Sequence, residues 1–123
     1  MPSNEEIQKL LNPENMRKLL CMAKERDITY KKHFLDRLEL RSKLNDFIPT
    51  DVKEFKKIII NRNPTLVIYE NEDAKFQVFY NMTEEYDLVI ILAIMHIRKP
   101  VRIRFITLHP QAVCERIEKY GRH

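Results

Sequence analysis

Two arginines separated by one residue carry the clearest chemical signal in this chain. Arg102 and Arg104 lie in the segment 101–108, where side chains alternate in the manner of a β-strand. Residues two apart point to the same face of a strand, so both guanidinium groups project from one sheet face. A guanidinium group stays charged at any working pH, and its planar donors match phosphate oxygens. The pair therefore predicts a site for RNA or another polyanion.

A second segment offers amides and an aromatic ring at the same spacing. Gln77, Phe79 and Asn81 alternate along residues 75–82. Beside the two arginines, such a ribbon is suited to holding phosphates and stacking a base. The competing interpretation is that this face is only the solvated side of an antiparallel sheet.

The best-placed proton-transfer group is His109, which precedes Pro110 where the last strand meets the last helix. An imidazole with an unperturbed pKa near 6.5 suits general acid or base work. The competing interpretation of His109 is a helix-entry residue. Strict alternation puts it on the face opposite Arg102 and Arg104, unless Pro110 twists the strand end. His33 and Arg37 lie one helical turn apart. Their side chains form either a stripe that contacts RNA or one that faces solvent or a partner.

Composition narrows the classes of function. The 123 residues carry 22 Lys plus Arg against 18 Asp plus Glu, a net charge of +4 that modestly favours nucleic acid. A single glycine rules out the glycine-rich phosphate loops. Two cysteines and four histidines without ligand spacing predict no metal, no disulfide and no cofactor. The longest apolar run, residues 88–95, is far shorter than the roughly 20 residues of a membrane span, so we expect a cytoplasmic protein.

The periodicity predicts a single α+β domain over residues 1–123. Helical spacing occupies the first half, with helices starting at Ser3, at Asn12 and running to residue 27, over residues 30–44, and after a Thr50 cap. After Pro64 the period becomes two, and four strands follow at residues 65–70, 75–82, 86–97 and 101–108. Connections this short force an antiparallel meander, with the third strand covered on both faces. A helix over residues 110–120 closes the fold.

Four short motifs carry a resemblance to a known family. They are His33-Phe-Leu-Asp-Arg37, Ile48-Pro-Thr-Asp-Val52, Pro64-Thr-Leu-Val-Ile68 and Ile103-Arg-Phe-Ile-Thr-Leu-His-Pro110. Together they resemble small prokaryotic His-x-x-x-Arg proteins related to the BrnT and RelE groups of toxin ribonucleases. Arg104 to Thr107, Glu115-Arg116 and Tyr120 are similar to the C-terminus of BrnT-like proteins. The toxin-like region covers residues 28–120, and residues 1–27 form extra N-terminal helices.

The resemblance implies a metal-independent endoribonuclease toxin that is neutralised by a small antitoxin protein. Arg104 and Arg102 would hold phosphate, His109 or Tyr120 would move protons, and His33 with Arg37 would form the helix signature. The sequence departs from the family where Arg41-Ser-Lys stands in place of Arg-Gly-Ile. An inactive relative, a noncatalytic RNA-binding module and a protein-interaction domain that uses the added helices are the alternatives.

Overall fold

The computed structural model describes residues 2–70 and 74–122. The chain begins with two helices, α1 (Asn4–Leu10) and α2 (Pro13–Met22), and a short 3-10 turn (Glu25–Asp27). After strand β1 (Ile28–Tyr30) come α3 (Lys32–Leu44) and α4 (Val52–Asn61). Four strands and a last helix follow: β2 (Leu66–Tyr69), β3 (Lys75–Asn81), β4 (Tyr86–His96), β5 (Arg102–Ala112) and α5 (Val113–Tyr120). The α+β class is therefore confirmed.

The sheet has the strand order β1-β5-β4-β3-β2. The last four strands form the expected antiparallel meander, but the expected number of four strands was wrong. Ile28–Tyr30 pairs in parallel with residues 103–105 of β5 and makes the sheet five-stranded and mixed. The sequence prediction left residues 28 and 29 between two helices and began the second helix at residue 30, because three residues are too few to show a period of two.

Several helix limits also differ from the sequence prediction. The Ser3–Glu6 capping box and the Asn12 cap are present as expected. However, α2 ends at Met22 rather than near residue 27, and Asp51 rather than Thr50 caps α4. The Asp51 carboxylate accepts a hydrogen bond from the Glu54 amide at 2.9 Å, and its charge complements the positive end of the helix. Pro110 lies inside β5 instead of opening the last helix.

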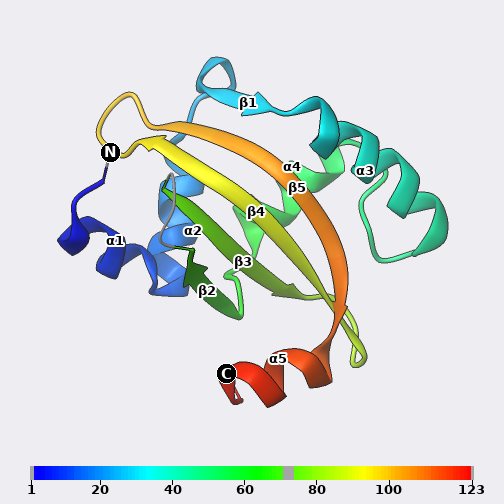
Figure 1. The fold of residues 1–123 in the computed structure, drawn as a ribbon. Helices are drawn as coiled ribbons and strands as arrows, with labels where there is room; N and C mark the ends of the chain where they lie inside the picture. The colour runs from blue at the N-terminus through cyan, green and yellow to red at the C-terminus, as the bar shows by residue number, and fades with distance from the viewer. Residues whose placement is uncertain (1, 71–73, 123) are drawn as a thin grey trace.

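The helices α1 to α4 cover one face of the sheet (Figure 1). They form a continuous core with the even-numbered residues from 76 to 80 of β3 and from 88 to 94 of β4, and with Ile103, Phe105 and Leu108 of β5. Ile7, Leu10, Met16, Leu19 and Leu20 belong to this core, so the first 27 residues are integral to the domain. Among the described residues, no helix combines the length and apolar character needed to span a membrane.

The other face, which we call the open face, is covered by α5 at one end only. There Arg116 donates hydrogen bonds to Asp87 at 2.6 and 3.4 Å, and both side chains are buried. Further along β4, Ile91 is half-buried and Met95 is 45% exposed. The prediction that this strand is covered on both faces is wrong beyond the reach of α5, which has only eight residues.

Candidate nucleic-acid interface

Arg102 and Arg104 lie on the open face, near the end of the sheet farthest from α5. Arg104 pairs with Thr29 of β1 and with Ala93 of β4, which in turn pairs with Lys75 of β3. Paired residues share a sheet face, so Lys75 and Arg104 flank the small Ala93 side chain from opposite sides. The two arginines therefore lie on a common face, as the sequence predicted, and have basic neighbours on other strands.

Three adjoining hollows at this end of the sheet gather the basic side chains. The first, of about 610 Å³, shares Arg26 and Asp27 with the second, of about 350 Å³. The second shares Met95 and Arg104 with the third, of about 300 Å³. Seven cations line the three hollows, and we call this group the basic end: Lys24, Arg26, Lys31, Lys75, Lys99, Arg102 and Arg104. Among the described lining residues the only carboxylate is Asp27, so cations outnumber carboxylates seven to one there.

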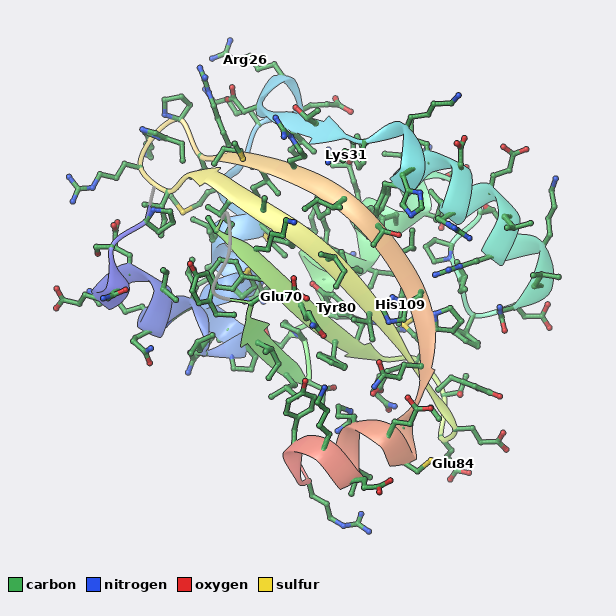
Figure 2. All side chains as sticks on the ribbon, in the orientation of Figure 1. Arg26, Lys31, Glu70, Tyr80, Glu84 and His109 are labelled. Carbon is green, nitrogen blue, oxygen red and sulfur yellow. The ribbon has the colours of Figure 1, made fainter. Side chains whose placement is uncertain are left out.

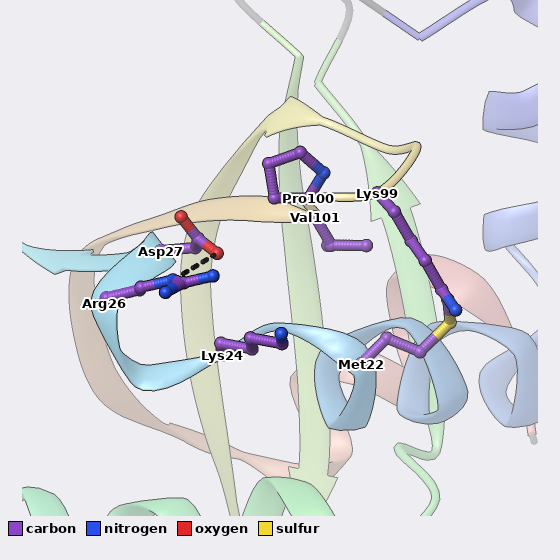
Figure 3. A pocket seen from close by; sticks show the side chains of 7 residues that line it. All are labelled: Met22, Lys24, Arg26, Asp27, Lys99, Pro100 and Val101. Carbon is purple, nitrogen blue, oxygen red and sulfur yellow. Dashed lines mark ion pairs between the residues drawn. The ribbon is translucent and has the colours of Figure 1, made fainter.

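The loop between β4 and β5 forms one wall of the largest hollow. Figure 3 shows Lys99, Pro100 and Val101 of this loop facing Met22 and Lys24, which end α2 and follow it. The His96 ring holds the loop, because its Nδ1 lies 2.6 Å from the Arg98 carbonyl oxygen and 2.9 Å from that of Pro100. Carbonyl oxygens only accept, so this contact needs a proton on Nδ1. The loop is thereby ordered by a side chain of the neighbouring strand.

A β-bulge moves His109 to the same face as the arginines. Ile91 pairs with Thr107, whereas the next residue, Leu92, pairs with Phe105, so Ile106 is inserted into β5 without a partner. One extra residue inverts the alternation beyond it. Strict alternation had placed His109 opposite Arg104, and that prediction was wrong. No sequence signal marks this bulge, because Phe105-Ile-Thr-Leu108 reads as an uninterrupted strand.

His109 is half-buried and lies beside α3. Burial lowers its pKa below the usual 6.5, and the Arg41 guanidinium lowers it further, while a side-chain hydrogen bond with Gln111 and the Glu115 carboxylate act in the opposite direction. Arg41 also donates a hydrogen bond to the Leu108 carbonyl at the edge of β5. The neutral imidazole is therefore favoured at neutral pH.

The three predicted catalytic side chains do not meet in one place. Arg104 and His109 lie opposite Ala93 and Val89, so four to five residues, or about 13–16 Å of strand, separate them. In Figure 2, Arg26 and Lys31 lie near one end of the sheet and His109 lies farther along β5. Tyr120 lies on α5, where its ring meets Phe79 edge-on with centroids 5.9 Å apart.

The remaining predicted RNA-binding residues are mostly engaged within the protein. Phe79 is only 1% exposed beneath Tyr120, so it presents no ring for stacking. Gln77 donates to Glu70, and Asn81 donates to the Thr83 carbonyl at 2.8 Å and to Asp87 at 3.2 Å. The expected ribbon is thus occupied at the end that α5 covers.

His33 and Arg37 lie on α3 and are exposed and half-buried, respectively. Neither lines any of the three hollows of the basic end. Conversely, sequence reasoning missed Lys24, Arg26, Asp27, Lys31, Lys75 and Lys99. They come from residues 24–31, from the start of β3 and from the β4–β5 loop. The pairing of β1 with β5, which the sequence did not predict, brings residues 24–31 beside the other two segments.

One family model matches the chain. It describes the MJ0788 family and aligns with residues 14–92, which is well over half of the sequence. The chain belongs to the MJ0788 family. The matched segment includes Lys24, Arg26, Asp27, Lys31 and Lys75 of the basic end but stops before β5. Searches of the curated proteins and of the solved structures gave no match.

The described residues hold no group of three or more His, Cys, Asp or Glu side chains placed to bind a metal ion. Cys21 and Cys114 are both free and exposed. The described lining of the basic end offers fixed cations around the Asp27 carboxylate.

Proposed function

We propose that this protein binds single-stranded RNA through the basic end. The observation that carries the proposal is the convergence of seven cations on three hollows that share lining residues. Lys24 and Lys31 follow α2 and β1, and the others come from the 3-10 turn, β3, the β4–β5 loop and β5. Grooves that follow a phosphate backbone are lined in this way, and they need no sequence-specific contact to bind. RNA binding is thus the first candidate function, and RNA cleavage is the second.

The arginines of β5 provide the test. Arg102 has a 63% exposed side chain, so replacing it has little effect on the core. We expect Arg102→Ala/Arg104→Ala to weaken binding of a fluorescein-labelled single-stranded RNA, measured by anisotropy at several salt concentrations. The slope of log affinity against log salt should fall by about 0.7 per lost phosphate contact.

Arg62→Ala/Arg122→Ala is the matched control, because both residues are exposed and neither lines the basic end. It removes the same charge and the same residue type. Equal losses of affinity in the two double variants would show that only net charge matters and would contradict the proposed site.

A second candidate function is metal-independent RNA cleavage, and the bulge in β5 favours it. The bulge returns His109 to the face of Arg104, and Arg41 lies beside the imidazole. A neutral imidazole can accept the ribose 2′-hydroxyl proton while the 2′-oxygen attacks the adjacent phosphorus. The bond from phosphorus to the 5′-oxygen then breaks, and the departing 5′-oxygen takes a proton from water. An arginine would stabilise the developing phosphorane charge. In this case the protein would act as a toxin whose partner is a small antitoxin protein.

Cleavage by this route leaves products that end in a 2′,3′-cyclic phosphate. We would incubate the protein with RNA and chelator and identify the product ends by mass spectrometry. His109→Ala should abolish the products but leave RNA affinity unchanged, since His109 lies outside the basic end. Intact RNA after incubation with the wild-type protein would dismiss the second candidate and leave the first standing.

A further inference from the structure

Asp27 is an anomalous group for a polyanion site. Its side chain is only 10% exposed, yet its Oδ2 atom has no hydrogen-bond partner within the described residues. The two nearest cations stay beyond hydrogen-bond distance, with Arg26 Nε 4.0 Å from Oδ2 and Arg102 Nε 3.8 Å from Oδ1. Burying a carboxylate without full hydrogen bonding is costly, so this arrangement calls for a donor that the protein itself does not provide.

Asp27 lines both the first and the second hollow, and so lies at their junction. The first hollow has an apolar floor made by Met22, Pro100 and Val101, with lysines and Arg26 around it (Figure 3). Its 610 Å³ is within the roughly 300–1,000 Å³ typical of pockets for small organic molecules. Arg26 lies over Oδ2 but is 78% exposed, so its side chain is free to move aside.

These features favour a ligand that combines phosphates, a flat apolar ring and a hydrogen-bond donor. The cations would attract its phosphates, whereas the Asp27 carboxylate would repel them, so another part of the ligand would contact Asp27. A flat, largely apolar ring fits the floor, and a group that donates hydrogen bonds fits Asp27. A nucleobase with an exocyclic amino group satisfies both requirements, since a carboxylate accepts from the N4 amino group of cytosine.

We propose that the hollow between α2, the 3-10 turn and the β4–β5 loop is a nucleobase subsite in which Asp27 selects bases that carry an amino group. The inference rests on the proposed RNA binding and deepens it. Cytosine and uracil are the matched probes, because they have the same size and differ in bearing an amino group or a carbonyl oxygen at position 4. The carbonyl oxygen of uracil would face the Asp27 carboxylate, and two acceptors repel each other.

The experiment compares the affinities of oligo(rC) and oligo(rU) of equal length for wild type, Asp27→Asn and Asp36→Asn. We expect wild type to prefer oligo(rC) by roughly tenfold, the discrimination of one good contact to a base edge. Asp27→Asn keeps the side-chain shape, but its amide both donates and accepts, so the preference should fall to near unity. Asp36→Asn, an exposed position on α3, removes the same charge and should keep the wild-type ratio.

The ratio of the two affinities, rather than either affinity alone, distinguishes selection of the base by Asp27 from its other effects on binding. Loss of a negative charge beside the arginines raises affinity for both polymers alike and leaves their ratio unchanged. A ratio near unity in wild type, or an equal ratio in wild type and Asp27→Asn, overturns the inference while RNA binding stands. Absence of binding to either polymer overturns the proposed function and this inference together.

Discussion

At the scale of single residues, the protonation of His109 couples the stability of the fold to pH. Its pKa is lowered in the folded state, first by burial and then by Arg41, from an ordinary value of 6.5. A group with a lowered folded pKa binds protons more readily in the unfolded chain, so protonation favours unfolding. The contribution of His109 is therefore complete above pH 6.5 and is lost as the pH falls below that value.

We expect His109→Gln to flatten the dependence of the free energy of unfolding on pH between about 5 and 7. Urea denaturation at several pH values measures this slope. His33→Gln, on the exposed side of α3, serves as the control and should keep the wild-type slope. An unchanged slope in His109→Gln would mean that the imidazole titrates normally in the folded protein.

The buried pair of Asp87 and Arg116 makes a different residue-scale prediction. Both side chains are almost fully buried, and the pair joins α5 to β4 of the sheet. Removing one member leaves an uncompensated charge in the interior. We expect Arg116→Met to lower the free energy of unfolding by about 3–5 kcal/mol.

Adding Asp87→Asn to Arg116→Met should recover part of that loss, because the orphaned charge is then gone. Urea titrations of both single variants and of the double variant give the coupling free energy. Glu115→Ala, an exposed neighbour, should change stability little. Strictly additive losses would show that the two side chains do not depend on each other.

At the scale of elements, a cluster of aromatic rings attaches β1 and two helices to β5. Tyr30 of β1 stacks on Phe105 of β5 with ring centroids 5.3 Å apart, and Phe34 and Phe55 close the cluster from α3 and α4. The Tyr30 hydroxyl is buried and has no hydrogen-bond partner within the described residues. The ring stabilises the junction of these elements, whereas the hydroxyl group destabilises it.

We expect Tyr30→Phe to raise the free energy of unfolding by about 1 kcal/mol, because it removes an unsatisfied polar group and keeps the ring. Phe34→Ala in the same cluster should lower it by about 3–5 kcal/mol. Burial also raises the pKa of Tyr30 to about 12 from 10.0, so the wild type loses stability as the pH rises from 10 toward 12. The advantage of Tyr30→Phe should therefore widen in that range, and a constant difference between the two proteins would contradict the assigned burial.

The elements also show which parts of the fold can be predicted from the sequence. Strong local periodicity identified β2 to β5 and the core-facing stripes of the helices, because burial imposes those patterns directly. The β1 strand left no such pattern, since its three residues pair with a segment far away in the chain. The bulge at Ile106 was not predicted for a related reason. An inserted residue can be recognised only from its register with the partner strand.

At the scale of the whole molecule, the difference between local patterns and long-range contacts explains which residues of the candidate site could be predicted. Arg102 and Arg104 were identifiable because both lie on one strand. The lysines, Arg26 and Asp27 were not, because they reach the basic end from segments that meet only through tertiary structure. The proposal of RNA as the partner rests on the sequence, whereas the convergence of the cations around Asp27 is visible only in the fold.

The parallel pairing of β1 with β5 also has a kinetic consequence. Ile28 and Ile103 are partners although 75 positions separate them along the chain, whereas the meander needs only short hairpin closures. Closing a long segment costs more chain entropy, and contacts of high sequence separation slow folding. During synthesis the β1–β5 contact cannot form until β5 has left the ribosome. The basic end would then be complete only after the chain has been made through β5, rather than after any earlier part of it.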